Sequence, residues 1–219
     1  MYFQFLIEDL SGSELIHQVM KIIKKKHPST DFDCKSFHGI GHLGVGSNAR
    51  EIKTGQILND LPIYIRGFSR SLRFSPSTIV VVLDNDERDP ILFRNQLEQV
   101  VKENEMGVEC VICIAIEELE AWLLGDENAI LAAYPDAKVS VLHSYNQDSI
   151  CGTWELLADA LYKGGHQRLI KDSLGYENIG KKKSEWAKKI SGYFNLHDNK
   201  SPSFQCFIQE IETRADVIS

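Results

Sequence analysis

The chain has 219 residues, of which 43% are hydrophobic and 25% are charged. This ordinary globular composition excludes an intrinsically disordered protein and a collagen-like chain. Its 31 acidic residues outnumber the 24 Lys and Arg residues, and the net charge of -7 excludes a strongly basic DNA-coating protein. The apolar runs are far shorter than the roughly 20 residues that a membrane span needs, and the first ten residues do not resemble a signal peptide. Five cysteines, an odd number, argue against a disulfide framework and predict a cytoplasmic protein.

The first part of the chain predicts a strand, a helix and a second strand. The apolar run 2–7 (YFQFLI) predicts a buried strand. Residues 11–27 predict a helix, because Ser11 and Glu14 have the spacing of a capping box and three lysines occupy the last turn. Residues 31–37 predict a weaker strand, since polar and apolar residues alternate there only in part.

The alternation of strands and helices then continues. The stretch 39–76, rich in Gly, Arg and Ser, is expected to hold a loop and a helix and to be among the least regular regions. The runs 78–83 (TIVVVL) and 109–116 (ECVICIAI) predict strands covered on both faces, as in parallel sheets. Between them, residues 90–105 predict a helix that begins with a proline, and another short helix is expected to end near Gly125.

The remainder of the chain predicts helices. No strong strand pattern follows residue 126, and helix patterns cover 127–135, 153–163, 181–194 and 203–215. The segment 136–150 is expected to be irregular. We therefore predict an α/β fold with a mainly parallel sheet over 1–126 and a helical C-terminal extension over 127–219, packed on the core as one structural unit.

Acidic residues follow three of the predicted strands, where each strand ends. In chain order they are Glu8 and Asp9, then Asp84 and Asp86, then Glu117, Glu118 and Glu120. The carboxyl ends of parallel strands meet at one edge of a sheet, which is where open α/β sheets bind ligands. Carboxylate oxygens are the ligands that Mg²⁺ or Mn²⁺ prefers, and such an ion can polarise a phosphodiester and activate a water. The sequence therefore favours a metal site at this edge.

Each of these segments also has a structural explanation. LDNDERD, taken alone, is more often a turn closed by Asn and Asp side chains than a metal site. The acids after the last strand could simply complement the dipole of the following helix. His38 and His42 lie in a Gly-rich loop and carry little weight as ligands. Cys110 and Cys113 point to opposite faces of a strand, so we expect core cysteines rather than a zinc site.

The order of the acids resembles a known catalytic core. A Glu after the first strand, an Asp-x-Asp after a later strand and a third acidic cluster are similar to the Toprim core of topoisomerases, DnaG-type primases and OLD-family nucleases. The segments IEDLSGSEL, VVVLDNDERD, EELEAWLLGD and SPSFQCFI resemble, more closely, a bacterial domain-of-unknown-function family related to RloB-type defence proteins. This resemblance covers roughly residues 3–210, with a poor match over 39–76.

The resemblance implies a Mg²⁺- or Mn²⁺-dependent phosphodiesterase, a nuclease in bacterial anti-phage defence. It assigns metal binding to Glu8, Asp84 and Asp86, and catalysis to Glu8, Glu117 and Glu120. One feature departs from the family pattern. Toprim cores commonly have Gly directly after the first Glu, whereas Asp9 stands there in this chain and the first Gly comes at position 12.

Nucleic acid, DNA or RNA, is the expected partner, so basic side chains must contact phosphate. Arg66 and Arg70 are interleaved with aromatic residues in IRGFSRSLRF, and Arg88 lies inside the acidic motif. These three arginines are the predicted substrate contacts. The lysines within 181–189 form a second basic patch or a solvated helix face.

Two function classes remain open from the sequence. The first is the metal-dependent nuclease, and the alternative is a non-catalytic Toprim-like sensor or scaffold subunit of a multi-gene system, with a protein partner encoded nearby. A PIN-like nuclease fits less well, because PIN-like cores usually begin with Asp where this chain has Glu8. A homo-oligomer is compatible with the sequence, and no membrane association is expected.

Overall fold

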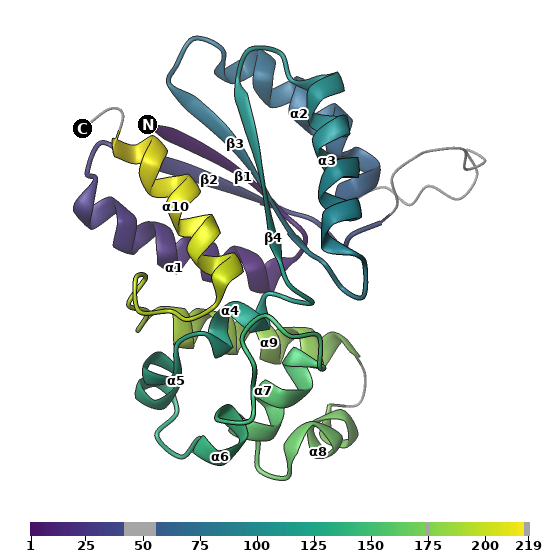
Figure 1. The fold of residues 1–219 in the computed structure, drawn as a ribbon, viewed down its shortest axis with the longest axis vertical. Coiled ribbons are helices and arrows are strands. Elements are labelled where there is room, and N and C mark those ends of the chain that lie inside the picture. Colours follow the sequence, from purple (N-terminus) through teal and green to yellow (C-terminus); the bar gives the residue numbers. More distant parts are fainter. Residues whose placement is uncertain (42–55, 174–175, 217–219) are drawn as a thin grey trace, which may run out of the picture.

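The computed structural model describes residues 1–41, 56–173 and 176–216. Its four strands form one all-parallel sheet in the order β2-β1-β3-β4 (Figure 1). The strands are β1 (Tyr2–Ile7), β2 (Asp31–Ser36), β3 (Ser77–Asp84) and β4 (Glu109–Ala115). The predicted α/β class with a parallel sheet flanked by helices is confirmed.

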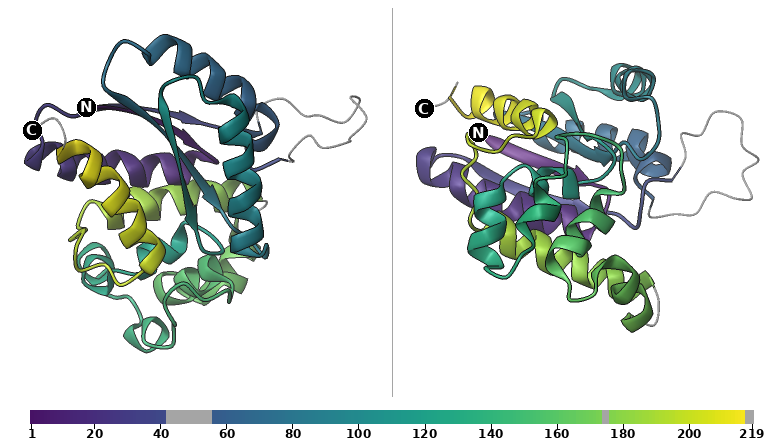
Figure 2. Two further views of the ribbon diagram at one scale, coloured as in Figure 1. Left: turned by 45° about the horizontal axis from the view of Figure 1, so that its top comes forward. Right: turned by 60° about the horizontal axis from the view of Figure 1, so that its bottom comes forward.

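Helices cover both faces of the sheet, because successive side chains of a strand point to opposite faces. One face carries Phe3, Phe5 and Ile7 of β1 and is covered by α1 (Leu10–Lys26) and α10 (Pro202–Asp216). The other face is covered by α2 (Ile57–Leu72) and α3 (Pro90–Asn104). The two views of Figure 2 show these helices on opposite sides of the strands.

A group of helices lies at the carboxyl ends of the strands (Figure 1). It consists of α4 (Glu120–Leu124), α5 (Glu127–Ala133), α6 (Val139–Leu142), α7 (Thr153–Leu161), α8 (Gly165–Asp172) and α9 (Tyr176–Ser191). From there the chain returns to the sheet, so that Phe207 of α10 stacks on Trp122 of α4 with ring centroids 5.0 Å apart. Phe207 also contacts Phe5 of β1 at 6.4 Å, so the apolar core is continuous from the sheet into the helical region.

Three local predictions are corrected by the structure. Helix α1 begins at Leu10, and Asp9 caps it by accepting the Gly12 N–H at 2.8 Å, so the predicted capping box is wrong. The region 39–76, expected to be among the least regular, contains the sixteen-residue helix α2, whereas residues 42–55 lie outside the described part. The segment 136–150, expected to be irregular, contains the short helix α6, and α8 adds to the helices expected after residue 126.

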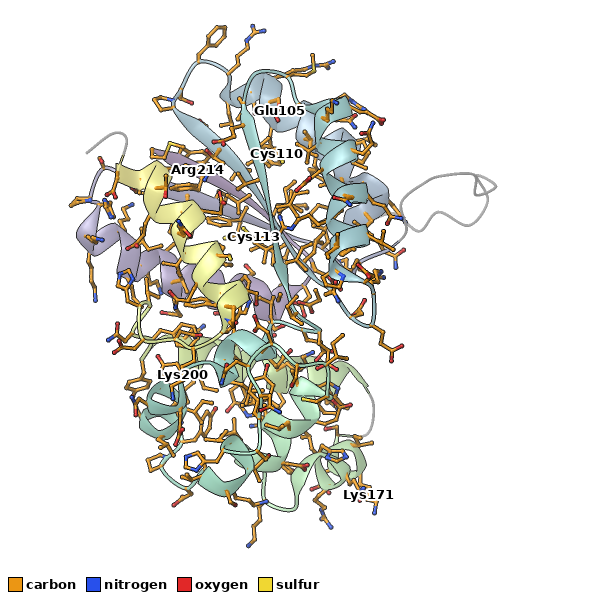
Figure 3. All side chains as sticks on the ribbon, viewed as in Figure 1. Glu105, Cys110, Cys113, Lys171, Lys200 and Arg214 are labelled. Carbon is orange, nitrogen blue, oxygen red and sulfur yellow. The ribbon has the colours of Figure 1, made fainter. Side chains whose placement is uncertain are left out.

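The two cysteines of β4 pack in the core, whereas Cys151 and Cys206 are exposed. Cys110 and Cys113 of β4 belong to the clusters on opposite faces of the sheet, as predicted (Figure 3). All five cysteines lie in described segments, and none forms a disulfide. Among the described helices, none is both long and apolar enough to span a membrane.

Candidate functional site

The strand order makes the loops after β1 and β3 diverge. From β1 the chain crosses through α1 on one face to β2, whereas from β3 it crosses through α3 on the opposite face to β4, on the other side of the sheet. Ligands bind in open α/β sheets at such a point. Glu8 directly follows β1 and Asp84 is the last residue of β3, so the sheet brings these two predicted ligands together.

The carboxylate of Glu8 binds the backbone of Asp84, and the carboxylate of Asp84 binds the backbone of Leu119. Glu8 Oε2 accepts the backbone N–H of Asp84 at 3.2 Å. Asp84 Oδ1 in turn accepts the backbone N–H of Leu119 at 3.0 Å. The second oxygen of each carboxylate, Oε1 of Glu8 and Oδ2 of Asp84, has no hydrogen bond to any described residue.

Both carboxyl groups resist ionisation. Removal from water raises the pKa of Glu8 to about 7; the hydrogen bond from Asp84 opposes this rise, and the charges of Asp86 and Asp9 add to it. Burial, followed by the charge of Glu8, holds the pKa of Asp84 well above its usual range. Such perturbed carboxyl pairs are concentrated at functional sites, because desolvation and like charge are costly unless a ligand compensates them.

Asp86 lies in a turn that follows β3. Its backbone is in the left-handed region (φ 50), which is uncommon for a residue other than glycine. The carboxylate forms an ion pair with Arg88, and the Asn85 side chain closes the turn by donating to the Arg88 carbonyl at 2.6 Å. The turn explanation of LDNDERD therefore holds, and the same turn places the predicted substrate contact Arg88 beside the acids.

A residue assigned by the sequence to a basic patch or a solvated face is part of this site. Lys183 of α9 is mostly buried, and its Nζ lies 3.2 Å from Glu120 Oε2 and 3.4 Å from Glu118 Oε2. Burial acts to lower the pKa of Lys183, but the carboxylates of Glu120, Glu118 and Asp84 raise it above its ordinary value. The solvated-face alternative is wrong for this lysine.

The sequence did contain a signal for Lys183. Buried apolar residues of α9 recur at Ile179, Trp186 and Ile190, at helical spacing. Position 183 lies on this stripe, four residues after Ile179 and three before Trp186. A lysine on the buried face of a helix needs an anionic partner, and the acids after β4 supply it.

The two other predicted catalytic glutamates have different surroundings. The Glu117 carboxylate accepts the backbone N–H groups of Cys151, Gly152 and Thr153 at 3.2, 2.8 and 2.9 Å, so it anchors the start of α7. Glu120 is 2% exposed, and burial raises its pKa while Lys183 opposes the rise. The structure therefore places Glu120 near the site and turns the Glu117 carboxylate away from it.

Two of the three predicted substrate arginines lie far from the acids. Helix α2 begins beside the Glu8 segment, where Gly39 N–H donates to the Glu8 carbonyl and Ile57 N–H donates to the Gly39 carbonyl. At 1.5 Å per residue, Arg66 and Arg70 are about 13 and 20 Å further along the helix. Arg66 donates to the Asn104 side chain at the opposite end of the sheet. Only Arg88 of the predicted three is close to the acidic site.

The donors fit a magnesium ion held by few protein ligands. Mg²⁺ is usually bound through one or two carboxylates, with water and substrate phosphate completing the shell. Glu8 and Asp84 offer one uncommitted oxygen each, whereas Asp86 is paired with Arg88. Among the described residues, no three His, Cys, Asp or Glu side chains form a group that could hold a metal. The arrangement therefore suits a two-carboxylate site that a substrate completes, not a closed protein cage.

Asp9 and Gly12, after β1, each have a local structural role. Asp9 is used as the cap of α1, and its carboxylate also accepts the Ser11 hydroxyl at 2.7 Å. Gly12 allows the backbone of α1 to approach Leu119 and Ile7 closely, because a Cβ there would lie 2.6 Å from the Leu119 side chain and 2.7 Å from the Ile7 side chain. The glycine thus lets α1 start tightly against β1 and the loop after β4.

Comparisons with family models, with curated proteins and with solved structures find no match to this chain. The fold class and the geometry of the acidic residues therefore carry the functional argument.

Proposed function

We propose that the chain is a Toprim-like, Mg²⁺- or Mn²⁺-dependent phosphodiesterase that cleaves DNA or RNA, in the role of a bacterial defence nuclease. The observation that carries this proposal is the meeting of Glu8 and Asp84 where the loops diverge, each with an uncommitted oxygen. The raised pKa values of both groups support it, because a cation would compensate the burial and the like charge that raise them.

The residues have separate tasks in this proposal. Glu8 and Asp84 would hold the metal. Asp86 would become a third ligand once its ion pair with Arg88 is broken. The bound ion supplies charge that polarises the phosphodiester and lowers the pKa of the attacking water. Glu8 Oε1 would either contact the ion or, where the two aspartates hold the ion, accept a proton from the attacking water, and the pKa of about 7 in the metal-free chain suits the second role near neutral pH. Arg88, once released from Asp86, pairs with a substrate phosphate oxygen.

Hydrolysis of labelled nucleic acids tests the proposal. Single-stranded and duplex DNA and RNA are incubated with the protein and Mg²⁺ or Mn²⁺. We expect Asp84→Asn and Glu8→Gln to lower the rate by at least about 100-fold. Glu98→Gln is the matched control, because this exposed glutamate lies on α3 and pairs with Arg94. A wild-type protein that is inactive on all substrates with both metals would contradict the enzyme assignment.

A second candidate function is a non-catalytic Toprim-like sensor or scaffold. Two observations favour it: Asp86 is held by Arg88, and the Lys183 ammonium already neutralises the acids after β4. Calorimetric titration with Mg²⁺ and Mn²⁺ separates the candidates. A nuclease binds a divalent ion, and Asp84→Asn abolishes this binding. A scaffold gives no heat of metal binding that depends on Asp84.

A further inference from the structure

Strand β4 forms one edge of the sheet, and its outer side has no neighbouring strand among the described residues. The Ala115 carbonyl accepts a backbone N–H from the segment after β3 at 2.9 Å, so Ala115 directs its backbone groups to β3. Because successive residues of a strand direct these groups to alternate sides, Cys110, Ile112 and Ile114 direct theirs away from β3. No described residue accepts from these three N–H groups, and one side chain, Arg94, donates to the Ile112 carbonyl at 3.2 Å. The edge therefore offers backbone groups to a further strand.

A groove follows the outer side of β4 and is bordered by α3 and α10, the helices on either side of this strand in Figure 1. It consists of two adjoining cavities of about 460 and 420 Å³, which share Arg94, Ile112 and Glu210 in their walls. Ile91 of α3 also lines the groove and is 70% exposed. An open strand edge with apolar side chains beside it is the kind of surface to which a further strand adds.

The two edges of the sheet differ in how they are protected. Edge strands of stable monomers often carry charged residues, which hinder pairing with another chain. In β2, the other edge strand, Asp31, Asp33 and Lys35 alternate with less exposed residues and are themselves exposed. In β4, Glu109 at the first position is the only charged residue, and the rest of the strand, CVICIA, is apolar. The composition of β4 therefore favours an edge that is paired with another strand.

Charges on α3 favour a second copy of the chain as the partner. Arg94 and Glu98 lie one helical turn apart, both line the groove, and Arg94 Nη1 is 3.9 Å from Glu98 Oε1. Helix α3 packs on β4, so a second copy that pairs its β4 in antiparallel orientation brings its own α3 alongside in the reverse direction. Arg94 of each copy then lies beside Glu98 of the partner subunit. The second copy thus supplies charges that complement those of the groove, and such charges give a contact its specificity.

We propose that two copies of the chain pair through β4 in antiparallel orientation, which joins their sheets into one continuous sheet across a two-fold axis near Ile112. Such a contact uses the same edge of both copies, so it closes after two copies and leaves the charged β2 as the outer edge on either side. The Ile112 N–H of each copy donates to the Ile112 carbonyl of the partner subunit. Arg94, displaced from that carbonyl, pairs with Glu98 of the partner subunit. The proposal does not depend on the proposed nuclease function.

Sedimentation equilibrium tests the role of the charges. We expect the wild-type chain at about 100 µM to have twice the mass of one chain. Arg94→Glu places like charges beside the axis and should weaken dimerisation at least about tenfold. The swapped variant Arg94→Glu/Glu98→Arg restores opposite charges and should dimerise within about threefold of wild type. Arg168→Glu is the matched control and should leave dimerisation unchanged, because Arg168 pairs with Asp172 at the same spacing on α8, away from β4 (Figure 1).

Hydrogen–deuterium exchange, measured by mass spectrometry, locates the contact. Peptides that cover β4 should exchange the outward amides of Cys110, Ile112 and Ile114 about tenfold more slowly at about 100 µM than at about 1 µM protein, because dimerisation gives these amides acceptors. Peptides that cover β2 should exchange at the same rate at both concentrations. A chain that stays monomeric at about 100 µM would overturn the proposal, and so would a dimer in which β4 exchange is independent of concentration. A swapped variant that dimerises no better than Arg94→Glu would overturn it as well.

Discussion

Lys183 is the residue on which the charge balance of the acidic site depends. Its ammonium lies 3.4 Å from Glu118 and 3.2 Å from Glu120, and both glutamates are largely shielded from water. Removing one partner of a buried ion group leaves uncompensated charge, which is more costly than loss of an exposed pair. Lys183→Met is therefore expected to lower the free energy of unfolding by about 3–5 kcal/mol at pH 8, as measured by urea denaturation.

A neighbouring lysine provides the control for this prediction. Lys182→Met removes an exposed pair with Glu185 on the same helix and is expected to cost less than about 1 kcal/mol. In the Lys183 variant the loss should shrink toward pH 5, because the pKa of Glu118, already about 7, rises further and the group becomes neutral. Equal losses in the two variants would show that Lys183 does not neutralise buried carboxylates.

The pKa of Glu8 gives a prediction for the pH dependence of stability. The pKa is about 7 in the folded chain and 4.5 ordinarily, so the folded chain binds the proton more tightly. The free energy of unfolding therefore falls as pH rises from about 4.5 to 7. Glu8→Gln removes this cost, and we expect the variant to be about 1–3 kcal/mol more stable than wild type at pH 8.

Thermal and urea denaturation at pH 5 and pH 8 check the Glu8 prediction. Glu98→Gln, the exposed control on α3, should change stability by less than about 0.5 kcal/mol at either pH. Saturating Mg²⁺ should stabilise wild type more than Glu8→Gln, because the ion compensates the buried negative charge of the carboxylate. A Glu8→Gln protein that is less stable at pH 8 would mean that the carboxylate supports the fold.

At the scale of elements, the sequence predicts buried strands better than helices whose residues have low helix propensity. The strands β1 and β3 are mostly apolar and buried because helices cover both faces, and β2 alternates because it is an edge strand with a partly exposed face. Helix α2 was harder to predict, since it contains Pro62 and a run of Arg, Ser and Gly. Burial of its apolar face stabilises the helix against these low propensities.

The site was predictable to the extent that it depends on strand ends. Glu8 and Asp84 come together because parallel strands place their carboxyl ends at one edge, which the sequence pattern alone could indicate. The partners of Arg66 and Lys183 depend on long-range contacts with Asn104 and with the acids after β4. A single sequence carries no spacing that specifies such partners. The apolar stripe of α9 could indicate that Lys183 is buried, but not which acids pair with it.

At the scale of the whole molecule, the sheet and the helical region depend on each other. Phe207 of α10 covers Phe5 of β1 and stacks on Trp122 of α4, while α9 packs against α1. A fragment that ends at residue 126 would expose these aromatic rings. Apolar area of this kind contributes about 25 cal/mol per Å² to folding, so its exposure lowers the stability of the fragment.

We therefore expect the full chain to unfold in a single calorimetric transition, with equal calorimetric and van't Hoff enthalpies. The fragment 1–126 should lack the near-ultraviolet circular dichroism that Trp122 gives in the full chain, because its stacking partner Phe207 is absent. Co-expression of 127–219 with the fragment should restore the signal if both segments complete one core. Two separate transitions, or a fragment 1–126 that unfolds cooperatively alone, would establish two independent domains. The acidic site would then lie at their junction, since Lys183 of the second part neutralises Glu118 and Glu120 of the first.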